Sequence, residues 1–351
     1  MPFSSTECIQ GRIGNDKSIL APMYLTNTYL QDNNDASIYS RFYNPNASAL
    51  EKTFAKIYST ENLKITHCHA LSSGMSAIVP LMLCLRQANQ TFLGTILVDK
   101  NSYRECLTVF RDVISLFYEV IETDLYDLDE TARLLREEKI DLIFVDVCPW
   151  PKYQKTDIAT ICELAHNGNY YTPVCVDNTN LSCWAYNPFE DDADIVIESL
   201  TKYCCGHGDI TGGVLLNRDC DSFINLLGCR MTAHDAWMLS RSMSTMDIRM
   251  EKIVLNTNAA YETLKELRPQ AEIHKCVGLI SYKNNDIKSL KKKIGEANVF
   301  HRDYSFGSDY SNITFETEDT IRFAIGLEST DDICKDLRVL LTEERENEQV
   351  S

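Results

Sequence analysis

The sequence has no hydrophobic run long enough to cross a membrane. Its longest clean apolar stretch, 77–85, has nine residues and contains Pro80, whereas a spanning helix needs about 20 apolar residues. The N-terminus, MPFSSTECIQGRIGND, shows neither the basic start and apolar segment of a secretory signal nor the arginine-rich pattern of a transit peptide. We therefore expect a cytoplasmic protein that does not bind membranes.

Positive charge is also scarce. The chain has 34 Lys and Arg against 51 Asp and Glu, a net charge of −17. Such an acidic surface repels phosphate backbones, so we expect no nucleic-acid partner. The apolar share of 44% and charged share of 24% are typical of globular proteins. A length of 351 residues allows one large domain and a smaller one.

Cysteine is too sparse for a disulfide scaffold. The chain has 14 cysteines, about 4% of its residues, and without an export signal we expect them to be reduced. Most of them, such as Cys84 and Cys175, lie in apolar runs that are typical of a core. The clusters 67–69 (HCH) and 204–207 (CCGH) lack a second ligand pair at zinc-finger spacing, so we expect no metal.

The middle of the chain alternates short apolar runs with longer helix-like segments. The short runs are apolar on both faces and therefore predict strands that are buried on both sides. Helical patterns over 127–138 and 156–166 lie between them. This alternation favours a mostly parallel sheet flanked by helices. The five expected strands are 95–99, 141–147, 173–178, 193–199 and 212–217.

The pattern changes near residue 235. A long helical stretch over 235–267 precedes shorter mixed segments and a final helix over 331–343, and the charged tail after it is expected to fray. We predict three parts: an arm over 1–45, a large domain over 46–235 and a small domain over 236–351.

Three features fall where predicted strands end, the edge at which open α/β sheets bind ligands. A turn of small residues over 71–76 opens an apolar helix and could bind an anion. Asp177 ends one strand, and Lys202 follows another, where partial burial would lower the pKa of its amine. Taken alone, the turn could be an ordinary helix start, Asp177 a cap for the next turn and Lys202 a surface lysine. Together they match the phosphate, pyridine nitrogen and aldehyde of pyridoxal phosphate.

The chain resembles the cystathionine γ-synthase family of pyridoxal-phosphate enzymes, which includes the cystathionine β-lyases and methionine γ-lyases. The resemblance implies an α/β fold of type I, like aspartate aminotransferase, with a mostly parallel seven-stranded sheet and a smaller C-terminal α/β domain. The matching motifs occur in the family's order over nearly the whole chain: 39–41 with 44–45, 72–75, 176–179, 199–203 with 206–207, 305–307 and 321–328.

The resemblance also implies a role for each matching position. Lys202 would bind pyridoxal 5'-phosphate covalently and shuttle protons, Asp177 would keep its pyridine nitrogen protonated, and Tyr103 would stack on its ring. The phosphate would be held by Gly74, Met75, Ser199 and Thr201, and by Tyr39 and Arg41 of a neighbouring subunit. Active sites would thus be shared within a homodimer or homotetramer. Arg322 would bind the substrate carboxylate, with Ser305 beside it.

Four positions bear on the substrate. Trp150 stands where the family has an asparagine that contacts cofactor and substrate. Arg104 and Glu105 replace small residues after the stacking tyrosine, and Tyr304 lies where members vary with reaction type. A family loop is also missing between 309 and 320. Each change could alter specificity, or Trp150 could pack inward and Arg104 and Glu105 could form a surface ion pair.

These features predict an enzyme of β- or γ-elimination or γ-replacement that acts on a sulfur-containing or homoserine-derived amino acid. The charges of Arg104 and Glu105 allow a specialised substrate with an unusual polar side chain. An alternative is a non-catalytic or regulatory paralogue, although retention of Lys202, Asp177 and Arg322 argues against it. An aminotransferase fits the motifs less well.

Overall fold

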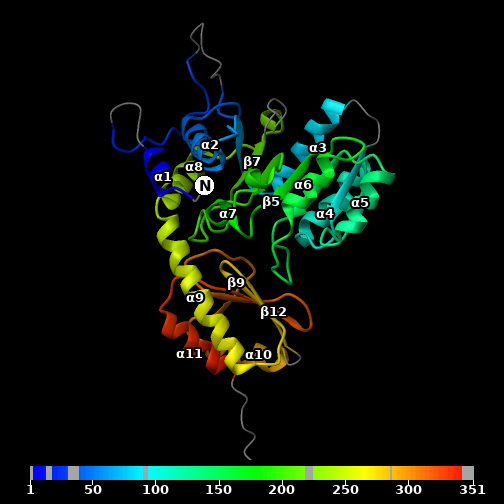
Figure 1. The fold of residues 1–351 in the computed structure, drawn as a ribbon. Coiled ribbons are helices and arrows are strands. Elements are labelled where there is room, and N and C mark those ends of the chain that lie inside the picture. Colours follow the sequence, from blue (N-terminus) through cyan, green and yellow to red (C-terminus); the bar gives the residue numbers. More distant parts are fainter. Residues whose placement is uncertain are drawn as a thin grey trace, which may run out of the picture. The chain divides into compact units, whose positions relative to one another are not determined.

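The computed structural model describes residues 3–12, 18–30, 39–89, 94–217, 224–284 and 287–341 (Figure 1). The chain forms two compact units. The first comprises Met1–Trp150 and Gln154–Asp247, and the second comprises Pro151–Tyr153 and Ile248–Ser351. The polar segment 31–37 of the expected arm and the charged tail lie outside the described residues. Among the helices of the described ranges, none is long and apolar enough to cross a membrane.

The first unit is built on a seven-stranded sheet of order β1-β7-β6-β5-β4-β2-β3. Strands β2 to β6 run parallel, whereas β7 is antiparallel to both neighbours. This confirms the expected mostly parallel α/β fold. The strands are β1 His67–Leu71, β2 Gly94–Asp99, β3 Tyr118–Thr123, β4 Leu142–Asp146, β5 Val174–Asp177, β6 Ile195–Glu198 and β7 Gly213–Asn217.

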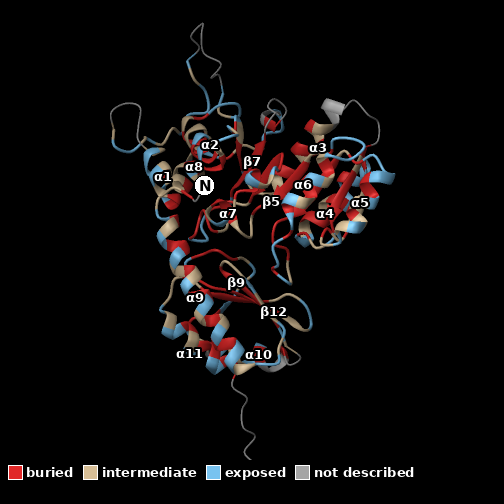
Figure 2. Cartoon of the chain, viewed as in Figure 1, coloured by how far each residue is buried: buried red, intermediate tan, exposed pale blue. Residues whose placement is uncertain are grey.

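Helices pack on this sheet because their apolar faces and the buried strands share one core. Side chains of α3 and α4 meet strand residues such as Val98 and Phe144 in that core, and the central strands are buried along nearly their whole length (Figure 2). The helices are α1 Ser5–Gln10, α2 Pro45–Tyr58, α3 Met75–Asn89, α4 Arg104–Asp112, α5 Leu128–Glu137, α6 Ile158–His166, α7 Ser182–Ala185 and α8 Ala233–Met243. Short 3-10 helices are η1 Ile114–Leu116, η2 Pro188–Asp191 and η3 Ile224–Leu227.

The second unit has a five-stranded sheet of order β10-β11-β12-β9-β8. Its core joins sheet residues such as Ile280 and Phe323 to helix residues such as Leu264 and Leu337. The elements are α9 Met246–Leu267, which begins in the first unit, β8 Ile273–Cys276, β9 Leu279–Lys283, α10 Ile287–Lys293, η4 Ile294–Glu296, β10 His301–Arg302, β11 Asn312–Phe315, β12 Thr320–Ala324 and α11 Thr330–Leu341.

The boundary between the units differs from the expected one. Instead of one helical stretch over 235–267, two helices meet at Ser244 and Thr245. Helix α8 packs against α2 of the first unit, and the indole of Trp184 donates to Asp247 at 2.8 Å. These contacts keep the chain in the first unit up to Asp247, beyond the boundary at 235 that the sequence indicated.

Candidate functional site

Lys202 lies in a tight turn that follows β6. Within the turn, the N–H of Lys202 donates to the carbonyl of Ser199 at 3.3 Å, and the N–H of Gly206 donates to the carbonyl of Lys202 at 2.9 Å. The Thr201 hydroxyl accepts from the N–H of Gly212 at 3.0 Å, which fastens the turn to the segment before β7. The lysine side chain is half-buried in a rigid backbone setting.

Asp177 is the last residue of β5, and its carboxylate is held by Thr179. The Thr179 hydroxyl donates to Asp177 Oδ1 at 2.6 Å, and the Thr179 N–H donates to the same oxygen at 3.0 Å. The hydroxyl in turn accepts from the N–H of Ser199 at 2.9 Å, so Thr179 links the ends of β5 and β6.

The pKa of the Asp177 carboxyl is raised because burial disfavours its charge. The hydrogen bonds from Thr179 and the positive charge of Lys202 oppose that shift. Since the lysine charge acts on Asp177, the two groups lie near each other. A further cation beside the carboxylate, such as a protonated pyridine nitrogen, would favour its ionised form.

The turn before α3 lies against the lysine turn. A Cβ atom on Gly74 would lie 3.0 Å from the Ser199 Cβ and 3.1 Å from its Cα, so any larger residue would push the two turns apart. Gly74 and Met75 open α3, where the first N–H groups have no partner within the helix. Backbone donors thus lie beside the hydroxyl-bearing Ser199, an arrangement suited to a phosphate group.

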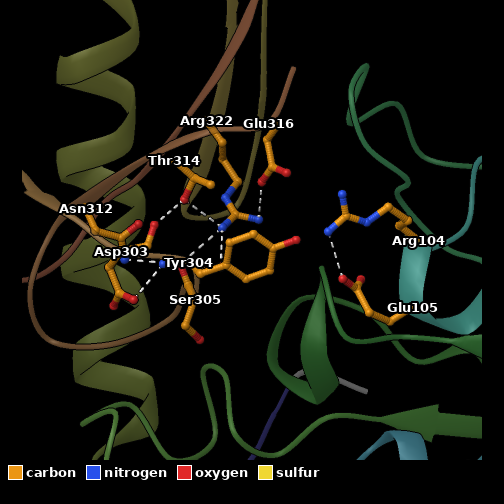
Figure 3. Close-up of polar contacts among 9 residues, drawn as sticks. All are labelled: Arg104, Glu105, Asp303, Tyr304, Ser305, Asn312, Thr314, Glu316 and Arg322. Carbon is orange, nitrogen blue, oxygen red and sulfur yellow. Dashed lines mark hydrogen bonds and ion pairs between the residues drawn. The ribbon is translucent and has the colours of Figure 1, made fainter. Parts of the chain in front are cut away.

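Helix α4 begins next to these elements. Its Cys106 thiol contacts the sulfur of Met75 at 3.5 Å. Tyr103 precedes the helix with 45% of its surface exposed. Arg104 pairs with Glu105 at 3.0 Å, as Figure 3 shows. Burial acts to raise the pKa of Glu105, but hydrogen bonds from Arg104, from its own backbone and from Tyr103 hold that pKa below its usual value.

Tyr39 and Arg41 lie on the surface of the first unit. Tyr39 is 39% exposed, and the Arg41 guanidinium stands 5.9 Å from the Tyr39 ring and 4.9 Å from the Phe42 ring. Trp150 is half-buried, and among the described residues its indole N–H has no hydrogen-bond partner although it is buried.

Arg322 of the second unit lies on β12 in a dense polar network (Figure 3). Its Nη2 donates to the carbonyl of Tyr304 at 2.6 Å and to the Thr314 hydroxyl at 3.0 Å. Its Nη1 pairs with Glu316 at 2.8 Å, with only 10% and 18% of the two side chains exposed. The Ser305 carbonyl lies 3.4 Å from Nη2. The carboxylate of Glu316 therefore already pairs with one nitrogen of the Arg322 guanidinium.

The structure gathers most of the predicted site residues in the first unit. Lys202, Asp177, Ser199, Thr201 and Gly74 meet through the contacts described above, with Met75 adjoining them. In the second unit, Arg322, Tyr304 and Ser305 cluster together. No role for Thr179 or Glu316 was predicted from the sequence. Thr179 could have been found, because a hydroxyl two residues after a strand-ending aspartate often bonds to it.

These residues fit pyridoxal phosphate by their donor chemistry. A helix start at Gly74 beside two hydroxyl residues suits its phosphate, and a half-buried lysine near a half-buried carboxylate suits its aldehyde and pyridine nitrogen. The fold and these residues together define the class of pyridoxal-phosphate enzymes with an α/β large domain.

The comparisons with known proteins agree. Residues 5–300 match the family model of Cys/Met metabolism PLP-dependent enzymes. The chain is 27% identical to a cystathionine β-lyase of Neurospora crassa, covering 90% of this chain and 76% of that protein. It is 27% identical to an L-methionine γ-lyase of Treponema denticola, covering 83% and 75%. A methionine γ-lyase structure from Micromonospora echinospora superposes with a TM-score of 0.86 at 21% identity, covering 97% and 99%.

The chain therefore belongs to the Cys/Met metabolism family of pyridoxal-phosphate enzymes. This confirms the expected family, the cofactor and the class of reaction, which is elimination or replacement on an amino acid.

Glu198, the last residue of β6, is a buried acid close to the lysine turn. Its carboxylate accepts from the Tyr58 hydroxyl at 2.5 Å, the Cys183 N–H at 3.0 Å and the Cys204 thiol at 3.1 Å. Burial raises its pKa from 4.5 to about 7 despite these hydrogen bonds. A raised pKa means that the folded protein loses stability as the pH rises through this window.

We expect Glu198→Gln to flatten that pH dependence. Between pH 4.5 and 7 the unfolded chain ionises Glu198 while the folded chain does not, which costs the wild type roughly 3 kcal/mol of unfolding free energy by pH 8. Urea unfolding at several pH values should show the variant gaining stability relative to wild type by that amount. A constant difference from pH 4.5 to 8 would contradict the shifted pKa.

Proposed function

We propose that this protein catalyses β- or γ-elimination or γ-replacement on a sulfur-containing or homoserine-derived amino acid, with Lys202 as the catalytic residue. The observation that carries the proposal is the placement of Lys202 in a fixed turn, near Asp177 and beside the Gly74–Ser199 contact. The printed names of its relatives, cystathionine β-lyase and L-methionine γ-lyase, support a sulfur amino acid as substrate.

Each residue has a physical task in this proposal. When bound, pyridoxal phosphate supplies an electron sink for the pair left on the substrate α-carbon. The N–H groups of Gly74 and Met75 and the hydroxyls of Ser199 and Thr201 bind the phosphate. Asp177 binds the pyridine nitrogen, which its ionised carboxylate keeps protonated.

The remaining residues act on the substrate. The Lys202 Nζ would take the proton from the substrate α-carbon and deliver it to the leaving group. Tyr103 covers the cofactor ring and excludes water from one face. Arg322 binds the substrate carboxylate through its planar fork, with Ser305 and Tyr304 holding that fork from the backbone.

We also propose a homo-oligomer with shared active sites, in which Tyr39 and Arg41 reach the phosphate of a neighbouring subunit. The described part of the N-terminal segment supports it, because several apolar side chains there are exposed. These are Ile19, Leu20, Leu25, Leu30, Tyr39, Phe42 and Tyr43. Such a surface is typical of a segment that another chain covers. The cytoplasmic location stays a prediction.

Covalent attachment at Lys202 tests the proposal directly. Borohydride treatment of the pyridoxal-phosphate-loaded protein should fix the cofactor on Lys202 as a stable amine, which peptide mass spectrometry locates. Lys202→Ala should abolish both the label and the turnover of cystathionine or methionine. Lys155→Ala, which changes an exposed lysine of the same unit, should retain both. Labelling elsewhere would refute the assignment, and labelling without turnover of any sulfur or homoserine-derived amino acid would favour the regulatory alternative.

The Thr179 hydroxyl should control cofactor affinity. Thr179→Val removes the bonds to Asp177 and to the N–H of Ser199, whereas Thr179→Ser keeps them. Losing a hydrogen bond to a charged group costs about 1.5–3 kcal/mol, so pyridoxal phosphate should bind about 10- to 100-fold more weakly to the valine variant. Absorbance titration measures the affinity. Equal affinities of the two variants would contradict a role for this hydroxyl.

Glu316 should compete with the substrate for Arg322. The Glu316→Gln substitution removes the charge that pairs with Nη1 and leaves Nη1 to the substrate carboxylate. If the lost ion pair is worth about 1.4 kcal/mol, KM should fall about tenfold while kcat changes little. Glu318→Gln is the matched control, since Glu318 is exposed on the same hairpin. An unchanged or higher KM for Glu316→Gln would show that the pair is structural.

A further inference from the structure

We propose that Cys183, Glu198 and Cys204 form a zinc site beneath the lysine turn. Cys183 lies on α7, Glu198 ends β6, and Cys204 follows Lys202 by two residues. All three are buried, and one ligand atom from each lies within 4.8 Å of the others. The proposal is independent of the catalytic role given to Lys202.

The distances suit a tetrahedral ion better than a disulfide. The two sulfur atoms are 4.0 Å apart, and the Cys204 sulfur is 3.1 Å from Glu198 Oε1. With zinc–sulfur bonds of about 2.3 Å, tetrahedral geometry places two sulfurs about 3.8 Å apart. A disulfide requires about 2.05 Å. Only small side-chain movements would therefore admit the ion between the sulfurs and the carboxylate oxygen.

Hydrogen bonds from neighbouring residues orient the Glu198 carboxylate as a metal ligand. Glu198 Oε2 accepts from the Tyr58 hydroxyl at 2.5 Å and from the Cys183 N–H at 3.0 Å. Tyr58 itself accepts from the Asn178 amide at 2.9 Å. These bonds fix one oxygen and leave Oε1 facing the sulfur of Cys204. Outer hydrogen bonds of this kind hold the ligands of protein metal sites in place.

The charge balance permits binding. Burial raises the pKa of the Cys183 thiol to about 12 and that of Cys204 well above its usual value, so both thiols carry protons. When Zn²⁺ binds, two S–H bonds break, two Zn–S bonds and one Zn–O bond form, and two protons leave for solvent. Above pH 7, where Glu198 is ionised, the net charge of the buried cluster is the same before and after, and no atom is oxidised or reduced.

These three side chains leave the fourth position of a tetrahedral ion to a water molecule, as at zinc sites with three protein ligands. A zinc ion shared by these residues would fasten α7 to the turn that carries Lys202. No metal was expected from the sequence, because Cys183, Glu198 and Cys204 do not form the closely spaced ligand pairs of a zinc finger, and only the fold brings α7, the end of β6 and the following turn together.

Cobalt titration of the reduced, pyridoxal-phosphate-loaded protein tests the site. One equivalent of Co²⁺ should give the visible absorption bands of a tetrahedral cobalt thiolate, and Zn²⁺ should abolish them. About two protons should be released in weakly buffered solution at about pH 8, where Glu198 is already ionised. Cys183→Ser and Cys204→Ser should lose the bands. Cys205→Ser is the matched control and should retain them, because this adjacent buried thiol contacts Asp209 instead.

A second measurement uses the wild type alone, in case the serine variants do not fold. In mild urea, Zn²⁺ should protect Cys183 and Cys204, but not Cys205, from alkylation, as read by peptide mass spectrometry. The proposal is overturned if the wild type takes up no stoichiometric Co²⁺, if protection is absent, or if folded serine variants bind as the wild type does. Oxidation that joins Cys183 to Cys204 without metal uptake would instead show a redox pair.

Discussion

The hydrogen bonds that Thr179 makes to Asp177 and to the N–H of Ser199 are the link on which the rest of the site depends. Strands β5 and β6 are buried and parallel, with Asp177 opposite Ile197 in register. Polar side chains can therefore gather only where the strands end. Through Thr179, the carboxylate at one strand end and the lysine turn at the next are held in one rigid arrangement.

The sequence predicted the strands whose burial is complete. Runs such as 141–147 and 193–199 are apolar on both faces because helices cover both, and each contains a strand of the sheet. It missed β1 and β3, which lie at the two edges. In β3, Glu119 and Glu122 interrupt the apolar pattern, and in β1 two histidines do so. Polar side chains that break the apolar run in this way give a weaker strand signal in the sequence.

The motif residues could be predicted because their neighbours in the chain identify each motif. Contacts that depend on the pairing of strands could not be predicted in this way. Thr314 lies opposite Arg322 in the register of β11 and β12, and Glu316 follows in the same hairpin. Nothing near Arg322 in the chain indicates that a carboxylate meets it. Glu198 likewise looks like an ordinary strand end, and only the fold brings Cys183, Tyr58 and Cys204 around it.

The positions that differ from the family pattern carry unequal weight. Arg104 and Glu105 bind each other with 72% and 38% of their side chains exposed, so their charges largely cancel, and such a pair stabilises little. Trp150 is different, because its indole N–H is buried without a partner among the described residues. An unmet buried donor costs free energy unless a ligand satisfies it. The specialised-substrate hypothesis therefore rests on Trp150, together with the carboxylate already held by Arg322, more than on the charged pair.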